Sequence, residues 1–223
     1  MNTAAFFDLD GTLLDGNSGW LWMTSEWRQR RITAKQMFDG TVYVIAYKLG
    51  MLDMEQAMAK ALETIRGNRE ESLRTRTHAW FHEQVAHRFS PPGLDAVEWH
   101  RAQGHKLVLL TSASLYESEA VASLLKLDHY LCTRYELKDG RFTGHYVLPQ
   151  CFGAGKVVWA RAYAQKNDID LAQSYFYSDS ITDLPMLETV GHPMVVNPDL
   201  RLRLLGHRRH WPIHSWSMAP NRS

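Results

Sequence analysis

Four short apolar runs punctuate the chain, and each is followed by small or polar residues. A continuous apolar run of this kind is typical of a strand that is buried on both faces of a parallel sheet. The sequence therefore predicts four parallel strands, each ending in a polar loop. The runs span residues 3–8, 106–111, 174–178 and 193–196.

Helical patterns lie between the predicted strands, over residues 92–103, 115–125 and 156–165. Alternation of strand and helix is typical of a parallel sheet covered by helices on both faces. We therefore expect an α/β fold with a doubly wound, Rossmann-like parallel sheet. Ligands of such sheets bind at the carboxyl ends of the strands, which is where the polar residues fall.

One long segment departs from this alternation. Residues 16–90 contain no convincing strand and are rich in Ala, Met, Glu, Gln and Arg, which favour helices. We expect this segment to form a helical cap domain inserted after the first strand. The α/β catalytic core then comprises residues 1–15 and 91–223.

Two further segments have local features of their own. Residues 132–145 predict a β-hairpin that turns at Asp139-Gly140, a pair that suits a tight hairpin turn. The tail from residue 200 is rich in Arg and His. We expect it to be a surface segment that is partly packed by Trp211 and Trp216.

Composition and charge narrow the choice of partners. The chain has 223 residues, of which 45% are hydrophobic and 22% charged, so it can bury a core. Its formal net charge of +1 gives no reason to expect nucleic acid or a membrane as a partner. Cys132 and Cys151 form no disulfide framework, and the N-terminal run lacks the features of a signal peptide. We expect a soluble, cytoplasmic protein, and the oligomeric state is left open.

Two carboxylates follow the first predicted strand. Residues two apart in a strand normally point to opposite faces, but at a strand end the second can turn back into the same site. Asp8 is then placed to attack a substrate, and Asp10 to transfer protons. Gly11 permits the sharp turn that this arrangement needs.

Polar residues of three other segments complete a candidate site. Ser112 offers a hydroxyl and Ala113 a backbone N–H at the end of the second strand, and both groups can bind phosphate oxygens. Lys156 follows Gly-Ala-Gly and places a cation at a helix start. Asp179 and Asp183 lie after the third strand and suit a hard cation that prefers oxygen ligands.

The four segments read DLDGT, TSAS, GAGK and YSDSITD in chain order. This order resembles the four signature motifs of the haloacid dehalogenase superfamily. The helical insertion after the first motif and the hairpin before the lysine resemble its phosphoserine-phosphatase-like branch. The resemblance implies a Mg²⁺-dependent phosphatase that hydrolyses a small phosphorylated metabolite.

The resemblance also implies a role for each matching residue. Asp8 corresponds to the nucleophile that forms an aspartyl-phosphate, and Asp10 to the general acid and base. Ser112 and the backbone N–H of Ala113 correspond to the phosphate-binding pair. Lys156 corresponds to the lysine that stabilises charge and also binds phosphate.

The metal ligands follow from the same resemblance. Asp179 corresponds to a Mg²⁺ ligand, together with Asp8 and the backbone carbonyl of Asp10. Asp183 corresponds to the residue that orients the metal-bound waters or the lysine. An aspartate at the position of Asp10 is found in phosphatases and phosphomutases of the superfamily, whereas its dehalogenases and P-type ATPases lack it.

The cap sequence bears on the substrate. In phosphoserine phosphatases, a cap glutamate reads the amino group and a cap arginine reads the carboxylate. Asn17 stands at the first position here, and Ala59 or Ala61 at the second, which argues against phosphoserine. Trp20 and other cap aromatics are expected to shape a different pocket. Histidinol phosphate is one candidate substrate among several.

Two other functions are compatible with the same residues. A phosphotransferase or phosphomutase would use the same aspartyl-phosphate chemistry, with a second substrate in place of water. A catalytically silent module that binds small molecules would keep the fold alone. The intact set of Asp8, Asp10, Lys156, Asp179 and Asp183 argues against the silent module.

Overall fold

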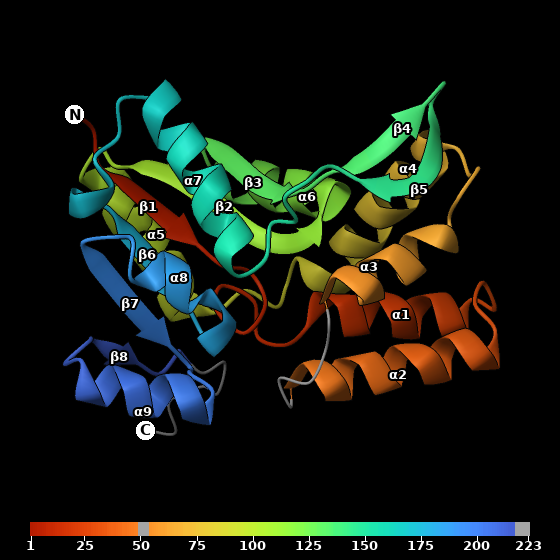
Figure 1. Cartoon of the computed structure of the whole chain (residues 1–223), viewed down its shortest axis with the longest axis horizontal. Helices are drawn as coiled ribbons and strands as arrows, with labels where there is room; N and C mark the ends of the chain where they lie inside the picture. Colours follow the sequence, from red (N-terminus) through yellow and green to blue (C-terminus); the bar gives the residue numbers. More distant parts are fainter. Residues whose placement is uncertain (49–53, 217–223) are drawn as a thin grey trace.

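The computed structural model of the chain describes residues 1–48 and 54–216, and its centre is a six-stranded sheet (Figure 1). Every neighbouring pair of strands in this sheet is parallel, and the order is β3-β2-β1-β6-β7-β8. This is the strand order of a doubly wound sheet, which confirms the predicted fold class. The strands are β1 (Ala4–Phe7), β2 (Lys106–Ser114), β3 (His129–Thr133), β6 (Tyr175–Ser178), β7 (His192–Val196) and β8 (Ile213–His214).

Helices cover both faces of the sheet. Successive side chains of a strand point to opposite faces, so the apolar side chains of these strands need cover on both sides. Phe7 and Leu109 pack toward one face and Phe6 and Leu110 toward the other, all of them fully buried. Each such side chain contributes about 1.5–3 kcal/mol to folding. The first face is covered by α5 (Pro91–Ala102) and α6 (Leu115–Leu125), and the second by α7 (Ala154–Lys166), α8 (Leu184–Leu187) and α9 (Leu200–Arg208). Two short 3₁₀ turns, η2 (Leu171–Gln173) and η3 (Ile181–Asp183), flank β6.

The segment after β1 is helical, as expected for an inserted cap. Figure 1 shows its helices together at one side of the molecule, beyond the carboxyl end of β1. No helix in residues 1–48 and 54–216 has the length and apolarity needed to cross a membrane. The helices are α1 (Ser18–Arg28), α2 (Ala34–Lys48), α3 (Met54–Glu63) and α4 (Glu70–Trp80), and α4 continues into a π-helical turn, η1 (Phe81–Val85).

The predicted hairpin is present as the antiparallel pair β4 (Tyr135–Lys138) and β5 (Arg141–Tyr146). Asp139 and Gly140 both have positive φ, at 52° and 70°, as a two-residue turn between twisted strands requires. The side chain of Arg141 donates to the carbonyl of Gly67 at 2.7 Å. The hairpin is therefore fastened to the cap segment.

Three sequence expectations about the sheet were incomplete or wrong. β2 runs on to Ser114, so Ser112 and Ala113 lie in the last part of the strand and not in a turn. β3 was not predicted, because its sequence HYLCT has no clear apolar run. The tail from residue 200 forms α9 and the edge strand β8 and is not simply a surface segment.

The packing of Trp216 anchors the end of the described chain. Its ring stacks on Tyr177 with 5.4 Å between ring centroids, and only 7% of the residue is exposed. Its backbone N–H donates to the Asn197 side chain at 2.7 Å. The expectation that this tryptophan packs the tail is confirmed.

Trp216→Ala should lower the free energy of unfolding by about 3–5 kcal/mol, because it leaves a cavity against the sheet. Trp27→Ala is the matched control, since Trp27 is 43% exposed on α1 and should cost much less. Urea unfolding of both variants measures the difference. Equal losses would show that Trp216 contributes little to the core.

Candidate active site

Asp8 stands directly at the carboxyl end of β1, in the middle of the sheet. Its backbone N–H donates to the carbonyl of Tyr177 at 3.0 Å, which extends the pairing with β6 by one residue. The side chain is 12% exposed, so the carboxylate is mostly buried but can still be reached. This is the position at which a doubly wound sheet presents a ligand site, because the strand order reverses here.

Gly11 lets the loop after β1 approach the end of β6. It has a positive φ of 72°, and an added Cβ would lie 2.3 Å from Oδ2 of Asp179. A side chain at this position would therefore displace the Asp179 carboxylate. The carbonyl of Gly11 accepts a hydrogen bond from Asn197 Nδ2 at 3.2 Å, and the same nitrogen donates to the carbonyl of Trp216 at 3.2 Å.

Lys156 joins two of the predicted carboxylates. Its Nζ donates to Asp8 Oδ1 at 3.0 Å and to Asp183 Oδ2 at 2.7 Å, and the lysine is 2% exposed. Asp183 Oδ2 also accepts from the Ser178 hydroxyl at 2.7 Å. Lys156 is therefore a buried residue and not a solvent-exposed lysine at the start of a helix. The Asp183 side chain makes no capping hydrogen bond to α8.

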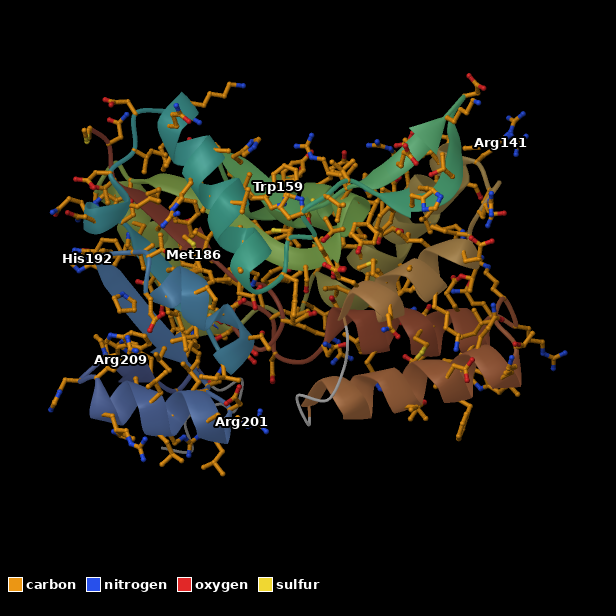
Figure 2. The ribbon with its side chains drawn as sticks, viewed as in Figure 1. Arg141, Trp159, Met186, His192, Arg201 and Arg209 are labelled. Atoms are coloured by element: carbon orange, nitrogen blue, oxygen red, sulfur yellow. The ribbon has the colours of Figure 1, made fainter. Side chains whose placement is uncertain are left out.

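The start of α7 is built to hold Lys156 against the sheet. Gly155 lies so close to the preceding loop that an added Cβ would be 1.9 Å from the carbonyl of Gln150. Trp159 Nε1 donates to the carbonyl of Pro149 at 2.8 Å, and Figure 2 shows Trp159 on α7. These contacts fix where the helix begins and therefore where the ammonium group lies.

Asp10 is bound to the first residue of the cap helix α1. Its Oδ1 accepts from the backbone N–H of Ser18 at 2.8 Å, and its Oδ2 from the Ser18 hydroxyl at 3.1 Å. Asp10 thereby links the loop after β1 to the cap. Sequence reasoning gave Ser18 no role, because one serine at a helix start is an unremarkable pattern.

Ser112 and Ala113 lie at the end of β2, the strand next to β1. Both are partly exposed, as a phosphate-binding pair must be. The backbone N–H of Ala113 donates to Thr111 Oγ1 at 3.1 Å. A phosphate oxygen that accepts from the N–H of Ala113 would therefore either share this donor with the Thr111 hydroxyl or displace that hydroxyl from it.

The two pocket residues predicted from the cap lie at the start of α1. Asn17 is the N-cap residue, and its side-chain oxygen accepts from the backbone N–H of Trp20 at 2.8 Å. Both residues are partly exposed. The carbonyl oxygen of the Asn17 side chain thus caps the helix, which is a common use of asparagine at this position.

The site concentrates negative charge in a buried place. Burial raises the pKa of Asp8 to about 7, with further increases from Asp183 and Asp10 and an opposing effect of Lys156. Burial, followed by Asp8 and Asp183, raises the pKa of Asp179 well above its usual range. Burial also raises the pKa of Asp10, although both Ser18 hydrogen bonds oppose it.

Lys156 alone does not balance these carboxylates. Burial disfavours its charged form, but Asp183 and Asp8 outweigh burial and raise the pKa of Lys156. The lysine is therefore a permanent cation facing several acidic groups. An added cation beside Asp8 and Asp179 would relieve their repulsion, so the charge of the site fits a divalent metal ion.

The donor atoms also fit such an ion. Carboxylate and carbonyl oxygens are the ligands that Mg²⁺ prefers. Within residues 1–48 and 54–216, no three His, Cys, Asp or Glu side chains are grouped as a metal site. A site made of the Asp8 and Asp179 carboxylates and the Asp10 carbonyl needs no third side chain.

Known proteins match this chain over most of its length. The family model for haloacid dehalogenase-like hydrolases matches residues 5–188. A phosphoserine phosphatase of Mycobacterium tuberculosis is 30% identical over 225 residues, which cover 98% of this chain and 72% of that protein. A histidinol-phosphatase of Neisseria meningitidis serogroup C is 26% identical over 218 residues, covering 96% of this chain and 98% of that protein.

A solved structure agrees with the sequence relatives. The crystal structure of a protein of unknown function from Bordetella pertussis superposes with a TM-score of 0.88 at 29% identity. The match covers 97% of this chain and 100% of the Bordetella chain. The resemblance predicted from the four motifs is confirmed, and the chain belongs to the family of haloacid dehalogenase-like hydrolases.

Proposed function

We propose that this protein is a Mg²⁺-dependent phosphatase that hydrolyses a small-molecule phosphomonoester through an aspartyl-phosphate on Asp8. The supporting observation is the buried contact of Lys156 with both Asp8 and Asp183. This contact holds a carboxylate nucleophile beside a fixed cation, at a strand end that a substrate can reach. Such an arrangement favours transfer of a phosphoryl group.

The first half-reaction transfers the phosphoryl group to the protein. A carboxylate oxygen of Asp8 attacks phosphorus, and the bond from phosphorus to the ester oxygen breaks. Asp10 gives its proton to the departing oxygen, so the free alcohol leaves. Lys156, the Ser112 hydroxyl and the N–H of Ala113 stabilise the charge on the remaining phosphoryl oxygens.

The second half-reaction restores the carboxylate. Asp10, now ionised, takes a proton from a water molecule as the water oxygen attacks phosphorus. The bond between phosphorus and the Asp8 oxygen breaks, and inorganic phosphate is released. Mg²⁺, when bound, supplies positive charge at the phosphoryl group. Asp8, Asp179 and the Asp10 carbonyl would hold it, with Asp183 fixing Lys156 beside them.

The substrate is proposed to be a small phosphorylated metabolite, with histidinol phosphate as one candidate. The relatives are named for phosphoserine and histidinol phosphate, two small phosphomonoesters. Asn17 at the position of the amino-reading glutamate disfavours phosphoserine. We also propose a cytoplasmic setting, in keeping with two buried free thiols, Cys132 and Cys151.

A phosphate-release screen tests the function directly. The purified protein is mixed with Mg²⁺ and a panel that includes histidinol phosphate, phosphoserine and 4-nitrophenyl phosphate. We expect Mg²⁺-dependent release of inorganic phosphate and faster turnover of histidinol phosphate than of phosphoserine. Transfer of the phosphoryl group to an added alcohol, without free phosphate, would indicate a phosphotransferase instead. No release from any ester would refute the proposal.

Asp8→Asn should abolish turnover while leaving the protein folded. The amide is a poor nucleophile, and a loss of more than about 10³-fold is expected when a covalent step is removed. Asp15→Asn is the control, because Asp15 is exposed in the same loop and should keep normal activity. Steady-state rates and the melting temperature are measured for both. A near-normal rate in the Asp8 variant would contradict the nucleophile assignment.

Mg²⁺ should stabilise the protein more at pH 8 than at pH 6. Because burial raises the pKa of Asp8 to about 7, protons compete with the metal below that pH. Without metal, the Asp8 carboxyl is protonated more often in the folded state than in the unfolded chain between about pH 4 and 7. Stability of the metal-free protein from this group therefore falls as the pH rises through that window.

The rise in melting temperature on adding Mg²⁺ measures this effect. Asp179→Asn should remove most of the rise at both pH values, because one ligand is lost. Asp15→Asn should retain it. A rise that is the same at pH 6 and pH 8 would argue against a metal bound by the buried carboxylates.

A further inference from the structure

A pocket outside the candidate active site lies between the cap and the hairpin. Its volume is about 490 Å³, within the range of pockets that bind small molecules. The residues that line it come from the cap, between residues 65 and 76, and from β5, and none belongs to the four polar segments of the candidate active site. Figure 1 shows the hairpin beside α3 and α4, on the side of the molecule away from β7 and β8. A ligand bound in this pocket would therefore be separate from the reacting groups.

The charged residues that line this pocket are all arginines. They are Arg69, Arg76 and Arg141, and Figure 2 shows Arg141 at the outer edge of the hairpin. In the part of the chain that the structure describes, no aspartate or glutamate lines the pocket. Like charges that share a pocket repel one another, so an anion bound among them would lower the electrostatic free energy.

Arg69 and Arg141 use few of their donor groups. The side chain of Arg69 makes no hydrogen bond or ion pair with any of the described residues. The side chain of Arg141 donates through Nη1 to the carbonyl of Gly67 at 2.7 Å. Because a guanidinium group carries five N–H donors, both arginines have donors left for a ligand.

Arg76 has a carboxylate partner but shares it with another arginine. Its Nη1 donates to Glu26 Oε2 at 2.9 Å, and Glu26 Oε1 accepts from Arg31 at 3.0 Å. One carboxylate thus faces two guanidinium groups. This arrangement leaves positive charge in excess beside the pocket.

The acidic residues at the start of α4 have other partners. Glu70 pairs with Arg74 at 2.9 Å, and Glu71 accepts from the Thr75 hydroxyl at 3.5 Å. Neither glutamate lines the pocket. The positive charge of the three arginines is therefore not offset within the pocket itself.

Backbone hydrogen bonds fix the walls of the pocket. The N–H of Gly67 donates to the carbonyl of Phe142 at 2.8 Å, and the N–H of Phe142 donates to the carbonyl of Asn68 at 3.1 Å. Arg69 and Arg141 form an antiparallel bridge between the same two segments. Because the two backbones are already held together, binding a ligand between them costs less conformational entropy.

The lining favours an organic phosphate over other anions. A guanidinium group can donate two parallel hydrogen bonds to a phosphate or to a carboxylate. A phosphate presents three oxygens around a tetrahedral centre and can accept from several arginines at once, whereas a carboxylate presents two oxygens in one plane. The apolar side chains of Ile65, Leu73 and Phe142 also line the pocket. The organic part of a ligand can pack against them.

We propose that this pocket is a second ligand site, which binds a small organic phosphate through Arg69, Arg76 and Arg141. The phosphate group contacts the arginines, and the organic part lies against the apolar residues of the lining. Because the site shares no residue with the candidate active site, the inference does not depend on the proposed phosphatase function.

Phenylphosphonate is a suitable probe, because it joins a phosphonate group to a ring and has no ester bond to hydrolyse. It is titrated into the isotope-labelled protein while NMR spectroscopy follows the Nε–H signals of the arginine side chains. We expect the signals of Arg69 and Arg141 to shift along saturating curves. The signal of Arg161, which is exposed on α7, should stay in place. Benzoate, which has a carboxylate, and inorganic phosphate, which has no ring, should each bind at least about fivefold more weakly.

Arg69→Gln makes the decisive variant. It should weaken binding, measured at the Arg141 signal, at least about fivefold, because one charged donor is lost. Arg161→Gln is the matched control and should leave the affinity unchanged. Arg141→Gln, followed at the Arg69 signal, should show a similar loss and covers the case in which the first variant does not fold. The glutamine variants also assign the signals, since each lacks one of them.

Three results would contradict the inference. Shifts that do not saturate would show only screening of surface charge. An affinity that Arg69→Gln and Arg141→Gln leave unchanged would place the bound phosphonate elsewhere on the protein. Benzoate that binds as tightly as phenylphosphonate would overturn the choice of a phosphate ligand.

Discussion

The buried contact of Lys156 with Asp8 and Asp183 is the interaction on which the candidate site depends. Removing one member of such a group leaves an uncompensated charge in the interior, which typically costs about 3–5 kcal/mol. The lysine comes from the start of α7 and the carboxylates from the ends of β1 and β6. The ammonium group can join them only when both strands and the helix are in place. Folding and the assembly of the candidate site therefore depend on the same atoms.

The sequence predicted the parts that follow from periodicity and local turn chemistry. Phe6 and Phe7 mark a strand buried on both faces, and Asp139-Gly140 marks a hairpin turn. The order of the four polar segments predicted which residues gather at the strand ends. Lys156 and Asp183 meet in the structure as that order implied.

Other features depend on contacts between segments that no local pattern records. β8 has only two residues and is a strand only through its pairing with β7. A segment this short has no hydrophobic pattern that would predict a strand. Ser18 gains its importance from the position of Asp10, which comes earlier in the chain.

The side chain of Asn197 has a wider consequence. One amide side chain binds both the carbonyl of Gly11 and the backbone of Trp216, so the loop that follows Asp8 is braced from the far edge of the sheet. Transplanting residues 8–13 into another parallel sheet would carry Asp8 and Asp10 but not this brace. A designer who borrows the loop would need to bring the asparagine, and the strand edge that supports it, along with it.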